Sequence, residues 1–448
     1  MANTDLTRTT GTPTNTDKFT FSVWIKRANI SNANQTILGT YTDGNNRSEF
    51  GFVTSDLLRW EFVESGSNVA TFETNRLFRD TNSWYHFVLA YDSSQASSSD
   101  RMKLYINGVQ ETSFASTNYP AQNANSRLNT SGKTIRIGSR GDGNQPFDGC
   151  MSHVHFIDGT AYAASDFGST DATTGEWKIN TSPNVTYGNN GFFILKNGNS
   201  VTDESPNTNN FTVNGGTLTK TEDCPSDVFA TLNPLHYSLN TSRAFSNGNT
   251  YVALGGTARV PEVSTIGMTS GKFYAEMKDI SGSGGGSIMG ITGQMRRASV
   301  VDFLGSKIYD YAYYSASGDK INDGNETSFG NSYTDGDIIG VAVDLDNLKI
   351  YFSKNGTWQN SGDPTSGSTG TGAAFTLAAP SSTIDGAYFF ACSDDNQYAE
   401  RRMAWNFGNG YFQTTAVSSA GTNASNIGIF EYDVPTGYTA LSTKGLNE

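Results

Sequence analysis

Residues 336–356, Gly-Asp-Ile-Ile-Gly-Val-Ala-Val-Asp-Leu-Asp-Asn-Leu-Lys-Ile-Tyr-Phe-Ser-Lys-Asn-Gly, decide the fold of the second half of this chain. Two apolar runs flank an Asp-Asn turn, and the second run ends at Asn-Gly. The first half has the same device in residues 84–92, Trp-Tyr-His-Phe-Val-Leu-Ala-Tyr-Asp, and 103–108, Lys-Leu-Tyr-Ile-Asn-Gly. Asn-Gly beside alternating apolar residues is the strongest short-range hairpin signal, because both turn residues need positive φ. The sequence therefore predicts two β-sandwich modules.

The composition agrees with an all-β protein. A chain of 448 residues is too long for one ordinary core, so two or three domains are expected. Its 48 Gly, 27 Phe and 21 Tyr, with only 16% charged residues, suit short strands and many turns rather than helices. No heptad, collagen or β-helix repeat is present, so the chain does not encode a long fibre shaft.

Charge and hydropathy exclude several classes of partner. The chain has 30 basic and 43 acidic residues, a net charge of -13 and no basic run, so nucleic acid is not an expected partner. No apolar run approaches the roughly 20 residues that span a bilayer, and no membrane insertion is expected. The N-terminal residues lack the basic and apolar regions of a secretory signal, so if the protein works outside cells it is expected to leave by another route, such as host lysis.

The cysteines do not form a recognisable site. Cys150, Cys224 and Cys392 lie far apart, are odd in number and include no Cys-x-x-Cys pair. We interpret them as small buried residues and do not expect a structural zinc.

Seven runs in the first half alternate apolar and polar residues as strands do. They are residues 19–25, 49–54, 58–64, 85–91, 102–106, 134–137 and 153–157. The motifs Phe-Thr-Phe-Ser-Val-Trp-Ile at 19–25, Ile-Arg-Ile-Gly at 135–138 and Phe-Asp-Gly-Cys-Met-Ser-His-Val-His-Phe at 147–156 occur in the order of the laminin-G or concanavalin-like family. Residues 17–160 resemble that family, which implies an antiparallel β-sandwich.

The second half resembles another sandwich family. Gly-Lys-Phe-Tyr-Ala-Glu-Met at 271–277, Ile-Met-Gly-Ile at 288–291 and the hairpin at 336–356 make residues 246–412 similar to SPRY domains. The expected fold is thus two antiparallel β-sandwich (jelly-roll) domains. An ordered, loop-rich connector, 161–245, joins them, because it keeps too many aromatic anchors for a free linker. Residues 1–16 are predicted to form an N-terminal docking segment and 413–448 a C-terminal segment.

The connector and the C-terminal segment carry a second resemblance. Residues 158–168, 187–193, 223–235 and 428–448 are similar to segments of large structural proteins of tailed bacteriophages. The resemblance implies a virion surface protein, either a capsid-decorating or a fibre-like component, with other virion proteins as partners, host surface glycans as ligands and a homo-oligomeric state. A tail receptor-binding protein for host adsorption is the alternative.

The histidines do not form a recognisable catalytic site. They are His86, His153, His155 and His236. His153 and His155 share one strand face and could chelate a metal with a third ligand, but two ordinary half-exposed strand residues are the expected use. Alternation places His86 on the solvent side of its strand.

The acidic residues also lack the spacing of a glycosidase. Glycosidases of this architecture commonly carry paired carboxylates on one strand. Asp344 and Asp346 share a face but lie beside a hairpin, which favours a turn-forming role. We therefore expect no enzyme activity, and a polysaccharide-degrading enzyme is the rival hypothesis.

Two loops of the first module carry candidate binding residues, because rigid sandwiches present recognition groups on loops. Their carboxylate, amide and guanidinium groups could hydrogen-bond glycan hydroxyls or supply oxygen ligands to Ca²⁺. The candidates are Asp43, Asn45, Asn46, Arg47, Arg140, Asp142 and Asn144. Turn formation is the competing interpretation. The laminin-G resemblance implies calcium in such loops, although no ligand set matches residue by residue.

One further candidate is an aromatic contact face. Tyr309, Tyr311 and Tyr313 would place three rings on one side of a strand, where they could stack against a sugar or another protein. Packing in the core is the commoner use of such a row.

Overall fold

Both Asn-Gly sequences form the tight turns that the sequence predicts. Asn107 and Gly108 have φ of 47° and 82°, and Asn355 and Gly356 have φ of 48° and 78°. Each pair joins two strands whose flanking residues are in register. The strands are β8 (Met102–Ile106) with β9 (Val109–Gln110), and β26 (Lys349–Lys354) with β27 (Thr357–Trp358). Positive φ at both turn residues is the type I′ geometry that matches strand twist.

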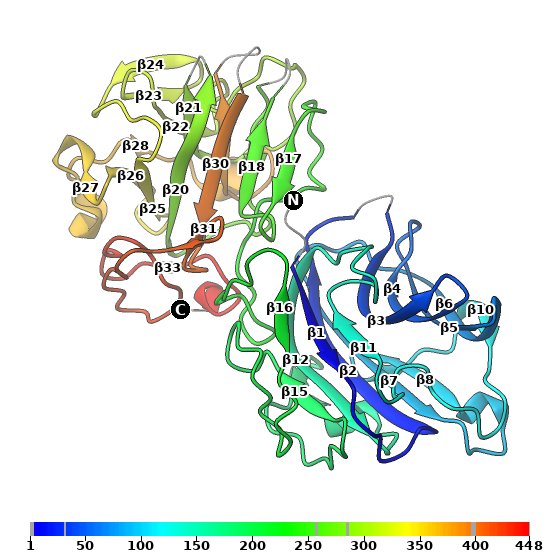
Figure 1. Ribbon diagram of the computed structural model, residues 1–448. Coiled ribbons are helices and arrows are strands. Elements are labelled where there is room, and N and C mark those ends of the chain that lie inside the picture. Colours follow the sequence, from blue (N-terminus) through cyan, green and yellow to red (C-terminus); the bar gives the residue numbers. More distant parts are fainter. Residues whose placement is uncertain (1–3, 31–32, 256–258, 284–285, 396–399, 448) are drawn as a thin grey trace. The chain divides into compact units, whose positions relative to one another are not determined.

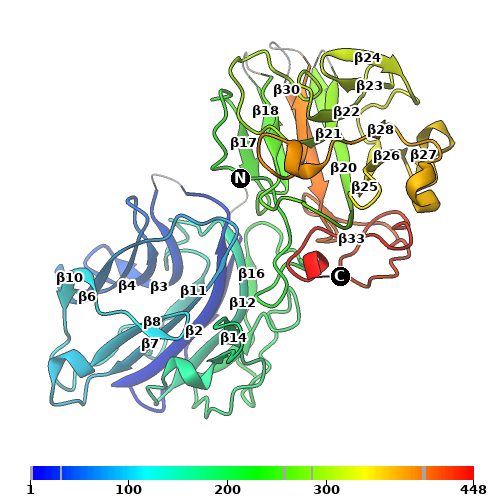
Figure 2. The same ribbon diagram turned by 180° about the vertical axis from the view of Figure 1, so that it is seen from behind.

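The structure, a computed structural model, describes residues 4–30, 33–255, 259–283, 286–395 and 400–447. The predicted terminal segments 1–16 and 413–448 therefore include a few residues that lie outside the described ones. The chain divides into two compact units, Met1–Lys220 and Thr221–Glu448, and the predicted connector spans the division. Figures 1 and 2 show that strands dominate both units.

Helical structure is limited to short 3₁₀ turns in the described part of the chain. They are η1 (Ser98–Asp100), η2 (Ala164–Asp166), η3 (Gln359–Ser361), η4 (Pro364–Thr369), η5 (Pro380–Ser382) and η6 (Gly445–Asn447). No helix in these described residues has the length and hydropathy to cross a membrane. The expected all-β fold is confirmed.

Two antiparallel sheets pack face to face in the first unit (Figure 1). The eight-stranded sheet has the order β10 (Phe114–Asn118), β6 (Ser67–Leu77), β5 (Leu57–Glu64), β4 (Asn46–Phe52), β3 (Gln35–Asp43), β11 (Thr134–Ile137), β1 (Asp5–Thr9) and β16 (Thr212–Asn214). The six-stranded sheet has the order β15 (Phe192–Ile194), β12 (Gly149–Asp158), β2 (Lys18–Arg27), β7 (Trp84–Asp92), β8 and β9. A small pair, β13 (Gly168–Thr170) and β14 (Trp177–Ile179), lies outside both.

The alternation along β2 explains the core of this unit. Phe19 and Phe21 point between the sheets, where Phe19 packs edge-on to Trp60 at 5.8 Å and Phe21 to Phe50 at 6.2 Å. These side chains are fully buried, and burial of such apolar area is the main stabilising contribution.

The first part of the predicted connector covers the other face of the six-stranded sheet. Ala164, Phe167, Tyr187 and Phe193 form a second apolar cluster with Val88 of β7 and Ile157 of β12. In addition, β15 pairs with β12, and β16 pairs with β1. Residues up to Lys220 therefore complete the first unit.

The segment predicted to dock, 1–16, contains β1. This strand lies between β11 and β16, with Leu6 opposite both Ile137 and Val213. Leu6 is buried in the core. Residues 5–9 are thus an internal strand of the sheet.

The second unit is also a two-sheet sandwich. The larger sheet has the order β17 (Ala244–Ser246), β18 (Tyr251–Leu254), β30 (Glu400–Asn406), β20 (Lys272–Ser283), β25 (Ile338–Asp344), β26 and β27, with β28 (Phe375–Thr376) on β26 and β33 (Thr439–Ala440) parallel to β20. The other has the order β19 (Glu262–Val263), β29 (Phe389–Asp394), β21 (Ser287–Thr292), β22 (Asp310–Tyr314), β23 (Asp319–Asn322) and β24 (Asn325–Ser328). A separate pair is β31 (Tyr411–Phe412) with β32 (Thr415–Ala416).

The C-terminal segment packs on the second unit through a buried carboxylate. Glu276 is fully buried and accepts hydrogen bonds from the backbone N–H groups of Glu431 and Tyr432, both at 2.9 Å. Nearby, Tyr274 packs edge-on to Phe430 at 5.0 Å. Residues after 412 are therefore an integral layer of this unit.

Candidate functional site

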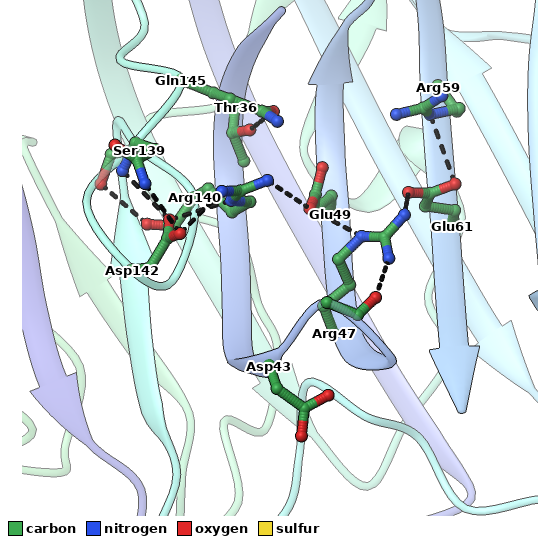
Figure 3. A network of polar contacts seen from close by, with 12 residues as sticks. Thr36, Asp43, Arg47, Glu49, Arg59, Glu61, Ser139, Arg140, Asp142 and Gln145 are labelled. Carbon is green, nitrogen blue, oxygen red and sulfur yellow. Dashed lines mark hydrogen bonds and ion pairs between the residues drawn. The ribbon is translucent and has the colours of Figure 1, made fainter. Parts of the chain in front are cut away.

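The 138–148 loop lies over β3 on the outer face of the eight-stranded sheet, and its Arg140 points toward Glu49, which Arg47 also contacts (Figure 3). One of the two predicted binding loops is the turn between β3 and β4, and the other is this 138–148 loop, which follows β11. Gly141 lies directly on β3, because a Cβ there would be 2.2 Å from the Tyr41 nitrogen. Glycine at this position permits the close approach of two backbones. The structure thus brings together residues that lie about a hundred positions apart.

Arg47 bridges two neighbouring carboxylates. Its Nε lies 2.9 Å from Glu49 Oε1, and its Nη2 lies 2.9 Å from Glu61 Oε1. Glu49 and Glu61 are directly opposite each other on β4 and β5. Arg59, also on β5, approaches Glu61 Oε2 through its Nε at 3.5 Å.

Arg140 connects the 138–148 loop to this row. Its Nε and Nη2 donate to the two oxygens of Asp142 at 2.9 and 2.7 Å, and its Nη1 lies 3.9 Å from Glu49 Oε1. Its guanidinium also lies 4.8 Å from the centre of the Tyr41 ring. We call the set Arg47, Glu49, Arg59, Glu61, Arg140 and Asp142 the polar face.

Two carboxylates of the polar face, those of Glu49 and Glu61, are more deeply buried than its three guanidinium groups, whereas the Asp142 side chain is 21% exposed, like that of Arg140. The Glu49 and Glu61 side chains are 6% and 5% exposed, whereas those of Arg47, Arg59 and Arg140 are 23%, 27% and 21% exposed. Burial, and then the charge of Glu61, raises the pKa of Glu49. Hydrogen bonds from Arg140 lower the pKa of Asp142. The surface therefore presents mainly guanidinium groups.

The polar face is shallow. A recess of about 10 Å³ lies between Thr36, Gly51, Arg59 and Gln145, beside Glu49. Such a volume has room for about one water molecule. A larger ligand would therefore lie along the surface of the sheet.

Hydrogen bonds between its own residues stabilise the tip of the β3–β4 turn. Asp43 Oδ1 accepts hydrogen bonds from the Asn45 backbone N–H at 2.8 Å and the Asn46 amide at 3.1 Å. The Asn144 amide likewise donates to Asp142 at 2.9 Å. These bonds are those of turn formation.

Asp142, one of the candidate calcium ligands, is already paired with an arginine. Arg140 occupies both oxygens of Asp142, and its positive charge opposes a cation there. Among the described residues, no three His, Cys, Asp or Glu side chains are grouped as metal ligands.

Comparison with known families agrees with this architecture. The Laminin_G_3 model, described as the concanavalin A-like lectin/glucanases superfamily, matches residues 2–166, and the SPRY domain model matches residues 273–378. The chain contains a concanavalin-like domain and a SPRY domain. Both parts of the expected fold class are confirmed, and we call the two compact units the concanavalin-like unit and the SPRY unit. No curated protein sequence matches the chain.

Solved structures similar to the chain share low identity with it. The SPRY domain of human HERC1 is 19% identical, with 39% of this chain and 96% of that one covered at a TM-score of 0.30. A putative carbohydrate binding protein from Bacteroides ovatus is 17% identical (49% and 61% covered, TM-score 0.30). A heptameric SAP-like pentraxin from Limulus polyphemus is 15% identical (44% and 90% covered, TM-score 0.29).

The proposed aromatic contact face is wrong for two of its three residues. Tyr311 and Tyr313 point into the core of the SPRY unit, where Tyr311 packs against Tyr388 and Tyr313 against Phe352. Tyr309 precedes β22 and is half-buried. The Tyr311 and Tyr313 side chains share one side of β22 as predicted, but that side faces the core of the unit and not the solvent.

The solvent-side prediction for His86 is also wrong. His86 is fully buried, because the segment around Trp177 covers its face of β7. The Trp177 indole donates to His86 Nδ1 at 3.0 Å, and His86 Nε2 lies 2.8 Å from Ser22 Oγ. Burial is the main cause that lowers the pKa of His86 to about 3. This Ser–His pair is therefore enclosed in the core, away from any substrate.

His153 and His155 do not share a strand face. A bulge between Ser152 and His155 gives His153 a φ of 48° and breaks the alternation. His155 is buried, not half-exposed as predicted, and its Nδ1 lies 2.9 Å from the Tyr187 hydroxyl. His153 is half-buried.

The carboxylates proposed for the rival enzyme form a turn. Asp344 is buried, lies 3.0 Å from Lys272 Nζ, and accepts from the backbone and side chain of Asn347. Asp346 accepts from the Gly271 N–H at 2.9 Å. Neither is placed as a glycosidase carboxylate would be.

The cysteine prediction is correct for one residue. Cys392 is buried, whereas Cys150 and Cys224 are half-buried, and all three are free thiols.

Sequence reasoning missed Glu49, Arg59 and Glu61. The available signal was the run Leu58-Arg-Trp-Glu-Phe62, in which charged residues alternate with large apolar ones. Such alternation places both charges on the outer face. That Glu49 lies opposite Glu61 depends on the register between β4 and β5, which the local pattern does not specify.

Proposed function

We propose that this protein is a non-enzymatic surface protein of a tailed bacteriophage virion, as a capsid-decorating or fibre-like component. We further propose that its concanavalin-like unit binds glycans of the host surface. The virion assignment rests on the resemblance of residues 158–168, 187–193, 223–235 and 428–448 to phage structural proteins. Under this proposal its partners are other virion proteins and further copies of the chain.

The observation that carries glycan binding is the convergence of the two loops on the polar face. Three guanidinium groups lie together there, with the carboxylates of Glu49 and Glu61 buried beneath them and Asp142 paired with Arg140 at the surface. The Arg59 Nη atoms have no hydrogen-bond partner among the described residues. Guanidinium N–H groups bind hydroxyl and carboxylate oxygens, both of which bacterial polysaccharides carry. Because the face is shallow, an extended polysaccharide suits it better than a single sugar.

A binding experiment tests this site. Full-length protein is passed over immobilised lipopolysaccharide and exopolysaccharide of the host, and affinity is measured by biolayer interferometry. Replacing Arg59 and Arg140 together by Ala should weaken binding at least about tenfold, as expected for two lost charged hydrogen bonds. Arg79→Ala is the matched control, because this exposed arginine lies in the same unit outside the polar face.

The outcomes are distinct. Unchanged binding by the double variant would remove the polar face as the site, and no binding by the wild type would remove glycan recognition. Each measurement is repeated with Ca²⁺ and with EDTA, since a calcium-dependent site elsewhere would lose binding only in EDTA.

Location is tested separately on phage particles. Gold-labelled antibody against the protein should mark intact virions. Label over the head supports decoration, label on the tail supports the alternative of a receptor-binding protein, and unlabelled particles would refute the virion proposal. A solution mass of about 48.2 kDa would contradict a homo-oligomer.

One observation favours the rival enzyme. Glu49 and Glu61 are adjacent carboxylates on one sheet face, and the pKa of Glu49 is raised. Glycosidases use such a pair, with the higher pKa on the general acid. Arg47 contacts both carboxylates and stabilises their charged forms, which opposes the acid role. Release of reducing ends from host polysaccharide, abolished in Glu49→Gln and Glu61→Gln, would establish the enzyme.

A further inference from the structure

A cavity opens at the edge of the concanavalin-like unit, where the chain crosses from one sheet to the other. Its volume is about 310 Å³, and its walls come from η1, β6, β8, β9, β10 and the crossover between β9 and β10. This volume lies at the lower end of the roughly 300–1,000 Å³ of small-molecule sites. The cavity lies between the sheet edges, whereas the polar face is on the outer side of β3, β4 and β5.

One wall of the cavity is aromatic. Phe114 stacks on Phe72 with ring centres 4.3 Å apart, and Tyr119 meets Phe72 edge-on at 5.5 Å. Phe72 is buried in the core, whereas Phe114 and Tyr119 are only partly buried. The core therefore holds the rings in place while part of their surface faces the opening. Flat apolar rings of this kind suit the C–H face of a ligand ring.

The charged groups around the cavity are already paired. Lys103 Nζ lies 3.0 Å from Asp100 Oδ1. Glu111 Oε1 accepts from the backbone N–H groups of Thr112 and Ser113 at 3.0 and 2.9 Å, and its Oε2 lies 3.4 Å from Arg76 Nε. A charged ligand would have to compete with these partners. The site therefore favours an uncharged ligand.

Uncharged hydrogen-bonding groups are available in the same walls. The Gln110 amide, the Thr117 hydroxyl and the Tyr119 hydroxyl line the cavity and make no hydrogen bond to other described residues. Together they offer both donors and acceptors. A ligand that uses them needs several neutral polar groups around a ring with an apolar face.

We infer that this cavity is a second binding site of the concanavalin-like unit and that it takes a neutral saccharide, as a single sugar or a chain end. Phe114 and Tyr119 pack against the sugar ring, and Gln110 and Thr117 bind its hydroxyls. The inference stands apart from the polar face: it concerns other residues and a smaller, uncharged ligand. Either site can be lost without the other.

Saturation-transfer difference NMR on the full-length protein tests the site. The probes are the methyl glycosides of glucose, galactose, mannose and N-acetylglucosamine, each alone, with methyl glucuronide as the anionic counterpart. At least one neutral probe should show transfer to its ring protons, and methyl glucuronide should bind at least about tenfold more weakly, since Asp100 and Glu111 already pair with the nearby cations Lys103 and Arg76.

Two variants separate the cavity from the rest of the unit. Thr117→Trp fills the cavity and should reduce affinity at least about tenfold, and Phe114→Leu, which keeps the apolar contact but removes the ring, should reduce it several-fold. Ser116→Trp is the matched control, because Ser116 is exposed on the same strand and does not line the cavity. Melting curves identify any variant that fails to fold. If Thr117→Trp or Phe114→Leu fails, the affinity of the variant that folds tests the site.

The inference is overturned if none of the four neutral probes binds. It is equally overturned if Thr117→Trp and Phe114→Leu both bind like the wild type. Loss of polysaccharide binding in the Arg59 and Arg140 double variant, with methyl glycoside binding retained, would show that the two sites are separate.

Discussion

At the scale of single residues, the hydrogen bond from Trp177 to His86 fixes a tautomer. Because the indole N–H only donates, His86 Nδ1 must accept, and the imidazole proton lies on Nε2, where it can bond to Ser22 Oγ. The ring is neutral and also stacks on Trp24 at 4.7 Å. One tryptophan of the predicted connector thus satisfies a buried nitrogen of the sheet.

Trp177→Phe should destabilise the concanavalin-like unit by about 1–3 kcal/mol, because it leaves His86 Nδ1 buried without a donor while retaining an aromatic ring. Urea unfolding, followed by circular dichroism, measures the change. Glu176→Gln, at the exposed neighbouring position, is the control and should leave the midpoint unchanged. Equal midpoints for Trp177→Phe and the wild type would contradict the role of this bond.

A second residue predicts a pH dependence. Asp394 is buried in the SPRY unit, and its Oδ1 has no hydrogen-bond partner among the described residues. Burial, and then the charge of Asp395, raises the pKa of Asp394 to about 7. An acid whose folded pKa is raised stabilises the fold below its unfolded pKa, and this stabilisation is lost as the pH rises through the folded pKa.

Asp394→Asn should therefore stabilise the SPRY unit increasingly between pH 4 and pH 7, with a gain of about 1–3 kcal/mol that levels off above pH 7. Differential scanning calorimetry at pH 4, 5.5, 7 and 8 measures the difference in melting temperature from the wild type. His236, whose lowered pKa makes stability rise with pH, contributes equally to the wild type and the variant. Its contribution therefore cancels when the two melting temperatures are subtracted. A gain that is constant with pH would refute the assignment to this carboxyl.

At the scale of elements, strand positions could be predicted because they depend on local alternation. Residues 102–106 and 134–137 are predicted and observed with the same bounds, and the run at 85–91 extends by one residue at each end as β7. Exposure could not be predicted in the same way. The burial of His86, Tyr311 and Tyr313 depends on which distant segment of the chain covers each side of their strands.

The polar face illustrates the same limit. Three of its members, Arg47, Arg140 and Asp142, could be identified from loop composition. Their convergence depends on the 138–148 loop, which leaves β11 opposite Leu38 and folds back over β3, so that Gly141 lies on Tyr41. Sequence spacing does not encode that neighbourhood.

Gly141→Ala tests the contact between loop and strand. The added Cβ would lie 2.2 Å from the Tyr41 nitrogen and 2.6 Å from the Thr40 carbonyl carbon, so the loop must move off β3. We expect a loss of about 1–3 kcal/mol in stability and weaker polysaccharide binding. Gly44→Ala is the control, because its nearest neighbour would be 4.0 Å away. If both variants melt and bind alike, the backbone contact is unimportant.

At the scale of the whole molecule, the predicted connector 161–245 is divided between the concanavalin-like unit and the SPRY unit. Residues up to Lys220 lie in the concanavalin-like unit and those from Thr221 in the SPRY unit. Its aromatic residues correctly predicted that it packs. Which unit they pack against depends on tertiary contacts such as that of Phe193 with His155, whose ring centres are 3.9 Å apart.

Fragments 1–220 and 221–448 should each fold alone, whereas fragment 1–160 should not. The shorter fragment lacks β15, β16 and the core residues Phe192, Ile194 and Phe211. Proton NMR dispersion and cooperative melting measure folding of each separately expressed fragment. A well-folded 1–160 fragment would show that residues 161–220 are dispensable.

The place of β1 also constrains the order of events during synthesis. Its partners, β11 and β16, end near residues 137 and 214, so β1 is hydrogen-bonded on both edges only after more than two hundred further residues have been added. Such distant pairing makes the final closure slow relative to local hairpins, and the nascent chain has an unsealed sheet edge throughout that interval.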